Sequence, residues 1–103
     1  MGGGKEGART VSYRVVLEPS ALQDLRKVAP DVQARLSRDL QRLARDPRPH
    51  DSEALHGKLR GLRKLRQGQW RIAYRVDDGA RTVHVVEVGH RATIYKRLAK
   101  KGG

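Results

Sequence analysis

Apolar positions in this chain follow a strand-like spacing near both ends and a helix-like spacing between them. Residues 11–17 alternate and are rich in β-branched side chains, which predicts a strand that stops at Glu18 and Pro19. We expect this strand at or near an edge of a sheet. Leucine and valine then recur three or four residues apart on both sides of Pro30, which predicts two amphipathic helices joined as a hairpin.

Polar residues at the predicted helix ends indicate where each helix begins. Ser20 and Gln23 match a capping box, so the first helix is predicted to begin at Ser20. Asp31 is predicted to cap the second helix, whose apolar stripe ends before Pro47. Residues 48–57 are polar and contain a further proline, so they are predicted to form a loop.

The C-terminal half predicts three consecutive strands with short turns between them. They cover residues 59–66 and 70–76, followed by a last strand that includes the valines of residues 83–88 and continues to Tyr95. Short turns predict antiparallel hairpins. The predicted fold is therefore a single small α+β domain of order β-α-α-β-β-β, with the helical hairpin packed on one face of an antiparallel sheet. The residues after Tyr95 either add a short basic helix across the open face or fray.

The middle strand of the three separates apolar from basic side chains. Trp70, Ile72 and Tyr74 share one face, while Arg71 and Arg75 share the other, because side chains alternate along a strand. The leucine stripes of the helices need an apolar surface, so we expect them to cover the first face and leave the basic face open. The valines of the last strand lie on both of its faces, so the pattern does not indicate which face of this strand points toward the core.

Length and composition limit the class of protein. With 103 residues the chain builds one core, and we divide it into a disordered tail (1–10), a domain (11–97) and a basic C-terminal tail (98–103). The absence of Cys excludes disulfides and Cys-based zinc sites and fits a reducing compartment. No apolar stretch is long enough for a membrane span or a signal h-region, so we expect a cytoplasmic protein without membrane association.

Positive charge is concentrated in the second half of the chain. Residues 56–103 contain 13 Lys and Arg against three acids, whereas residues 1–55 contain 10 against eight. Such an excess points to a polyanion or an acidic protein as partner. No Walker-type glycine loop, His-Glu-x-x-His, Gly-x-Ser-x-Gly or convincing carboxylate pair is present, which excludes nucleotide hydrolases, metallohydrolases and serine hydrolases of those types.

The basic face carries residue types that suit phosphates. They are Lys64, Arg66, Arg71, Arg75 and Arg91, together with Tyr95 and His90. Metal-free RNA cleavage needs a group to deprotonate the ribose 2′-hydroxyl, cations to stabilise the phosphorane and a proton source for the leaving oxygen. Lys, Arg and Tyr can fill these roles, so the chemistry predicts no cofactor and no metal.

The ordered motifs of the chain resemble the RelE branch of the RelE/ParE toxin superfamily. They are Leu59-Arg60-Gly61, Lys64-Leu65-Arg66, the run from Gly68 to Arg75, Val88-Gly89-His90-Arg91 and Tyr95, and the resemblance covers roughly residues 12–97. It implies a RelE-like microbial RNase fold and a toxin of a type II toxin–antitoxin system. It also implies a ribosome-dependent endoribonuclease that cuts messenger RNA in the ribosomal A site. The implied partners are a RelB-like antitoxin, the ribosome and mRNA.

The resemblance assigns roles to individual side chains. Arg71 is expected to stabilise the transition-state phosphate, Arg91 to hold the phosphate or assist the leaving oxygen, and Tyr95 to stack on or activate the nucleotide. Lys64 is the candidate general base. Some family members carry a second lysine where this chain has Leu62, and Arg60 or Arg63 could compensate for its loss.

Further residues are candidates for binding RNA or the ribosome: Arg60, Arg63, Arg66, Arg75, His90, Lys96 and Arg97. Glu87 and His90 are secondary candidates for the catalytic site, because other branches of the family use a Glu–His or His–His arrangement. The run from Lys96 to Lys101 either contacts ribosomal RNA or only solubilises the chain.

Two other classes of function are alternatives. A ParE-type inhibitor of DNA gyrase, without catalytic activity, is the main alternative, although that branch usually lacks the full Arg, Arg and Tyr set. A DNA-binding helix-turn-helix is disfavoured, because the second helix begins with Asp31 and Gln33 and not with basic residues.

Overall fold

The computed structural model describes residues 12–102, so the predicted disordered tail over residues 1–10 lies outside the described residues. The elements are β1 (Arg14–Leu17), α2 (Pro19–Lys27), α3 (Pro30–Arg45), β2 (Ser52–Ala54), the 3-10 turn η1 (Gly57–Leu59), β3 (Arg63–Gln67), β4 (Trp70–Asp77), β5 (Thr82–His90) and α4 (Ile94–Gly102). This order confirms the predicted α+β class. None of the described helices is long and apolar enough to cross a membrane.

The five strands form one sheet in the order β1-β5-β4-β3-β2. The antiparallel meander of β3, β4 and β5 was predicted, and β1 lies at an edge as expected. The prediction of a wholly antiparallel sheet is wrong, because β1 pairs with β5 in parallel and Val15 lies opposite Val83. This pairing joins segments far apart in the chain, so the alternation within either strand carries no information on their relative direction.

The predicted loop over residues 48–57 contains a strand. β2 pairs antiparallel with β3, with Ser52 opposite Leu65, at the other edge of the sheet. The next predicted strand begins at Arg63 and not at residue 59, because residues 57–59 form the 3-10 turn. A three-residue strand is too short to show a period of two, which is why the pattern missed it.

Both predicted helix caps are wrong. α2 begins at Pro19 with Glu18 at the N-cap, and α3 begins at Pro30 with Ala29 at the N-cap. Neither cap residue makes a side-chain cap hydrogen bond. Proline suits the first helical position, because its fixed φ is already helical and its missing N–H would have no intrahelical partner. Asp31 lies in the first turn of α3, where its charge favours the helix dipole.

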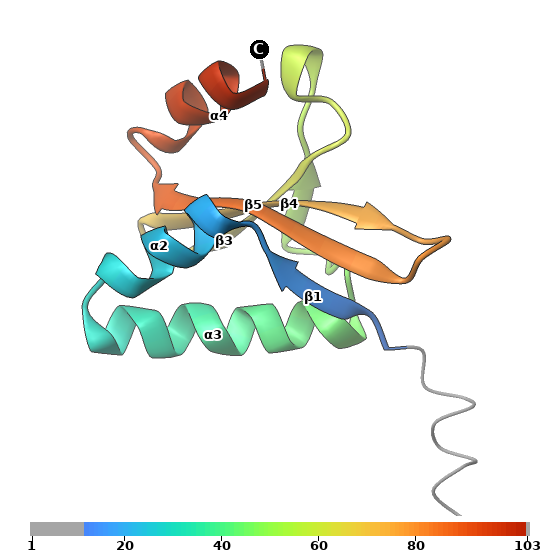
Figure 1. The fold of residues 1–103 in the computed structure, drawn as a ribbon, viewed down its shortest axis with the longest axis horizontal. Coiled ribbons are helices and arrows are strands. Elements are labelled where there is room, and N and C mark those ends of the chain that lie inside the picture. The colour runs from blue at the N-terminus through green and yellow to red at the C-terminus, as the bar shows by residue number, and fades with distance from the viewer. Residues whose placement is uncertain (1–11, 103) are drawn as a thin grey trace, which may run out of the picture.

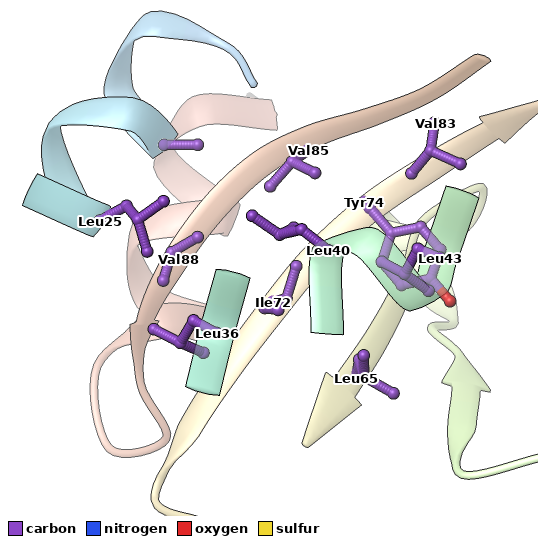
Figure 2. Close-up of a cluster of buried hydrophobic side chains, with 11 residues drawn as sticks. Leu25, Leu36, Leu40, Leu43, Leu65, Ile72, Tyr74, Val83, Val85 and Val88 are labelled. Atoms are coloured by element: carbon purple, nitrogen blue, oxygen red, sulfur yellow. The ribbon is translucent and has the colours of Figure 1, made fainter. Parts of the chain in front are cut away.

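The main core lies between the sheet and the layer formed by α2 and α3 (Figure 1). Figure 2 shows the leucines of α3 gathered against β4, with Leu40 and Leu43 near Ile72 and Tyr74. Leu36, Leu43, Ile72 and Tyr74 are each fully buried. Burying one such side chain stabilises the fold by about 1.5–3 kcal/mol relative to leaving it exposed.

A β-bulge explains why the valines of β5 did not indicate an inward side. The register shifts between Ala73 and Tyr74, which pair with Glu87 and Val85 and leave Val86 as the extra residue. As a result Val85 belongs to the core under α2 and α3, whereas Val86 packs on the opposite face of the sheet.

The opposite face of the sheet is partly covered by α4 (Figure 1). The predicted continuation of the last strand to Tyr95 is wrong, since β5 ends at His90 and α4 begins at Ile94. Ile94 and Leu98 are buried against Ala73 and Val86, which forms a second, smaller core. The predicted boundary between residues 97 and 98 therefore falls inside α4, and of the two states foreseen for this segment the structure contains the helix.

Candidate functional site

Three basic side chains lie together on the α4 face of β3 and β4. Arg66 is the cross-strand partner of Arg71, and Lys64 is the partner of Ala73, so Lys64 and Arg71 are diagonal neighbours. Direct partners have Cβ atoms about 5 Å apart and diagonal ones about 7–8 Å apart. The antiparallel register thus concentrates three positive charges in an area that one phosphate group with its neighbours would cover.

Tyr95 completes this cluster from the first turn of α4. The Lys64 Nζ lies 5.5 Å from the centroid of the Tyr95 ring, within the range of a cation–π contact. Tyr95 is half-buried against the second core. Lys64 also faces an acid that the sequence did not place here, because its Nζ is 3.5 Å from Glu53 Oε1 on β2. The missed strand β2 is what brings Glu53 to the site.

Arg71 is the most buried cation of the cluster, with 8% of its surface exposed. Its Nη1 donates hydrogen bonds to the carbonyls of Gly68 and Trp70, each at 2.9 Å. Its Nε is buried and has no hydrogen-bond partner. A buried donor without a partner is costly in a folded protein. The guanidinium therefore braces the β3–β4 turn and retains a free donor.

Arg91 follows the last residue of β5 and contacts the same turn. Its backbone N–H donates to the Gln69 carbonyl at 2.8 Å, and its Nε donates to Gln69 Oε1 at 3.3 Å. The Arg91 side chain is otherwise exposed. Gln69 was predicted to lie in a turn and within one of the family motifs, without a role of its own, and it ties Arg91 to the end of the sheet.

His90 lies on the other side of the sheet from Lys64 and Arg71. It pairs with Trp70, and the two rings meet edge to face with centroids 5.8 Å apart. Its Nδ1 accepts a hydrogen bond from the Ala92 N–H at 3.1 Å. The structure therefore separates His90 from the basic cluster.

Two predicted RNA-binding residues have partners within the fold. Arg63 faces the α3 side and donates to Ser52 Oγ at 2.8 Å. Arg97 pairs with Asp24 at 2.7 Å and with Glu87, and the hydrogen bond that it donates to Asp24 raises the pKa of the guanidinium. Arg60, Arg66, Arg75 and Lys96, by contrast, are exposed.

Glu87 belongs to an ion cluster that attaches α4 to the sheet. The carboxylate is buried and pairs with Arg97 and with Lys101, whose Nζ is 3.1 Å from Glu87 Oε1. Lys101 also donates to the Val86 carbonyl at 2.6 Å and to the Ser20 hydroxyl. The Glu87 carboxylate is thus engaged by two cations of α4.

Leu62, at the position where some relatives carry a second lysine, packs on the second core with Leu59 and Tyr95. It also lines a cavity of about 200 Å³ beside α4, together with Glu18, Arg75, Val86, Leu98 and Lys101. Leu62 thus supports the element that carries Tyr95. Within residues 12–102 no three His, Asp or Glu side chains lie close enough together to hold a metal ion.

Comparison with known proteins agrees with the fold. Residues 15–95 match the family model described as the ParE toxin of type II toxin–antitoxin systems. The toxin RelG of Mycobacterium tuberculosis is 35% identical over 86 residues, which are 82% of this chain and 98% of RelG. The RelBE2 toxin–antitoxin complex of M. tuberculosis contains a chain with a TM-score of 0.73 and 33% identity, over 82% of this chain and 97% of that one. The isolated Escherichia coli RelE toxin gives a TM-score of 0.68 and 26% identity, over 87% and 98%.

Proposed function

Because this chain belongs to the RelE/ParE superfamily and is a toxin of a type II toxin–antitoxin system, we propose that it is an mRNA interferase that cuts messenger RNA in the ribosomal A site. The observation that carries the proposal is the cluster of Lys64, Arg66, Arg71 and Tyr95 on one face of the sheet. A phosphodiester laid on this face would meet several cations and an aromatic ring at once.

The reaction proposed is attack of the ribose 2′-oxygen on the neighbouring phosphorus. The bond from phosphorus to the 2′-oxygen forms, the bond to the 5′-oxygen breaks, and a cyclic phosphodiester and a 5′-hydroxyl result. Lys64, in its neutral amine form, would accept the 2′-hydroxyl proton. Tyr95, whose ring centroid lies 5.5 Å from the Lys64 Nζ, would stack on the nucleotide that carries this hydroxyl. Arg91 would bind the phosphate and stabilise the leaving 5′-oxygen, which would take its proton from water.

Arg71 would supply fixed positive charge where the phosphorane gains negative charge. Its guanidinium is held by two carbonyls, so little reorganisation is needed during the reaction. This fixed, partly buried charge supports a role for Arg71 in transition-state stabilisation.

Exposed cations in the cluster and around it would contact the RNA backbone and the ribosome. They are Arg60, Arg66, Arg75 and Lys96. Binding through such residues weakens steeply as the salt concentration rises. Arg63, Arg97 and His90 have internal contacts and are left out of this surface.

A RelB-like antitoxin is proposed as the protein partner. The RelBE2 complex of M. tuberculosis and the E. coli RelBE complex are both toxin–antitoxin assemblies, with chains 33% and 28% identical to this one. A net charge of +12 favours an acidic or amphipathic antitoxin segment over the basic face.

A ParE-type gyrase inhibitor is the second candidate, and the matching family model favours it. It would need no catalytic residues. A single alanine substitution would then weaken gyrase binding by one contact only, whereas loss of Arg91, which is exposed, would abolish RNA cleavage while leaving the fold and antitoxin binding nearly intact.

The test adds wild-type, Arg71→Ala or Arg91→Ala protein to a cell-free translation reaction, maps mRNA ends by primer extension and measures gyrase supercoiling in parallel. Arg38→Ala is the matched control, because Arg38 is an exposed residue of α3. Cuts that require ribosomes, persist with Arg38→Ala and disappear with Arg71→Ala and Arg91→Ala would support the proposal. Intact messenger together with blocked supercoiling would transfer the protein to the gyrase-inhibitor class.

A further inference from the structure

The β3–β4 turn holds the residue that follows β5 through two atoms of Gln69. The Gln69 carbonyl accepts the Arg91 backbone N–H at 2.8 Å, which fixes where the Arg91 main chain lies. Gln69 Oε1 accepts the Arg91 Nε at 3.3 Å, which restrains the direction of the side chain. One residue therefore restrains both the main chain and the guanidinium of Arg91.

Gln69 is itself held in place by Arg71. The carbonyls on either side of it, those of Gly68 and Trp70, both accept hydrogen bonds from Arg71 Nη1. Three successive carbonyls of the turn are thus bonded to two arginines. Gly68 has φ +60°, a left-handed conformation that glycine adopts without strain, and this lets the turn point its carbonyls inward.

The contact at Nε has a specific consequence for an arginine that binds phosphate. An exposed arginine loses considerable rotamer freedom when it binds, and this loss opposes binding. Engaging Nε in advance lowers that cost and leaves the two terminal nitrogens of Arg91 for a bidentate contact with a phosphate. In the described part of the chain, no hydrogen bond or salt bridge engages those terminal nitrogens.

The amide of Gln69 suits this task better than a carboxylate would. Its oxygen orients the guanidinium without neutralising it, so the full positive charge stays available to the phosphate. A glutamate at this position would keep an acceptor but would also compete with the phosphate for Arg91.

We propose that Gln69 is a positioning residue that orients Arg91 toward the phosphate to be cleaved. The inference rests on the proposed mRNA-cleaving function. Gln69 would not touch the reacting atoms and would act through the Arg91 side chain. The hydrogen bond between the Gln69 carbonyl and the Arg91 N–H would hold the end of β5 against the β3–β4 turn whatever side chain stands at position 69.

A double-mutant cycle on full-length protein tests this, with the single-turnover rate of ribosome-bound mRNA cleavage as the readout. Gln69→Ala should slow cleavage roughly ten-fold, the size expected for loss of a hydrogen bond to a charged group. In an Arg91→Lys background the same change should alter the rate less than about two-fold, because lysine has no Nε to orient. Gln41→Ala is the matched control, since Gln41 is an exposed residue of α3.

Gln69→Glu separates orientation from a purely structural role. If the Gln69 side chain only supported the turn, glutamate would restore both stability and cleavage, because it also accepts the Nε hydrogen bond. We expect stability near wild type, followed by the fluorescence of the single Trp70, but cleavage no faster than in Gln69→Ala. Full recovery of cleavage with glutamate would overturn the inference.

The other outcomes are also decisive. Unchanged cleavage by Gln69→Ala, or an equal loss in the Arg91 and Arg91→Lys backgrounds, would overturn the positioning role while leaving mRNA cleavage established. A wild-type protein that leaves mRNA intact in the same reaction would overturn the proposed function and, with it, this inference.

Discussion

Leu98→Ala is expected to destabilise the whole domain, although the residue lies in a segment whose composition indicates a solvated basic tail. Leu98 is 2% exposed and packs with Ile94 against Ala73 and Val86. Truncating a buried leucine to alanine costs about 2–5 kcal/mol, depending on how far the site collapses. Since Leu59 and Leu62 nearby are only partly buried and can move inward, we expect the lower part of this range, about 2–3 kcal/mol.

The measurements are a urea titration and a thermal melt, each followed by Trp70 fluorescence and by far-ultraviolet circular dichroism. For a domain of this size, 2–3 kcal/mol corresponds to a fall in Tm of roughly 10–20 °C. Leu22→Ala is the matched control, because Leu22 is 38% exposed on α2, and we expect it to cost no more than about 0.5 kcal/mol. Equal stability of the two variants would refute the docking of α4 and restore residues 98–103 to a solvated tail.

Three further outcomes are expected. The Arg48 guanidinium, with Tyr13 as a second donor, lowers the pKa of Asp78 from its ordinary value of 3.8 to about 2. The ionised carboxylate therefore stabilises the native state at every pH above 3.8, and this contribution is lost as the pH falls toward 2. Asp78→Asn should therefore be less stable than wild type at pH 7, with the difference disappearing by about pH 2 in acid unfolding curves; a constant difference would contradict the shift. Tyr95→Phe should keep most of the cleavage rate and of the RNA affinity if the ring acts by stacking, whereas Tyr95→Ala should lose about 1–3 kcal/mol of RNA-binding free energy. An equal loss of RNA affinity in both variants would assign the role to the hydroxyl. Arg63→Ala should leave mRNA cleavage within two-fold of wild type and lower stability slightly, because its guanidinium bonds Ser52; loss of cleavage without loss of stability would return Arg63 to the site.

The spacing of apolar residues within short segments predicted the helices and the longer strands. The leucine stripe of α3, the alternation of β4 and the short turns between β3, β4 and β5 each appear within a dozen residues, and the structure agrees with all three. The placement of Lys64, Arg66 and Arg71 on one face follows from the same alternation combined with hairpin register. Tyr95 was grouped with them as a phenol beside the basic residues, on the expectation that it lay in a strand, whereas it reaches Lys64 from a helix.

The contacts that the patterns missed involve distant or very short segments. β2 is too short to show a period, and it is the strand that brings Glu53 to Lys64. Gln69 carries no chemical signal in sequence, because an amide in a turn is usually solvated, and its contact with Arg91 exists only after β4 and β5 have paired.

The sequence by itself therefore determined the class of fold, the apolar and basic faces of the sheet and the excess of charge, since these depend on residue type and on spacing within one element. Only the tertiary structure decided the parallel pairing of β1, the docking of α4 through Glu87, and which cations remain free. Arg97 and Arg66 are equivalent in sequence as exposed basic residues, and they differ because folding places Asp24 and Glu87 beside one of them. Whether a charge is available to a partner depends on which distant carboxylates the fold brings within a few ångströms of it.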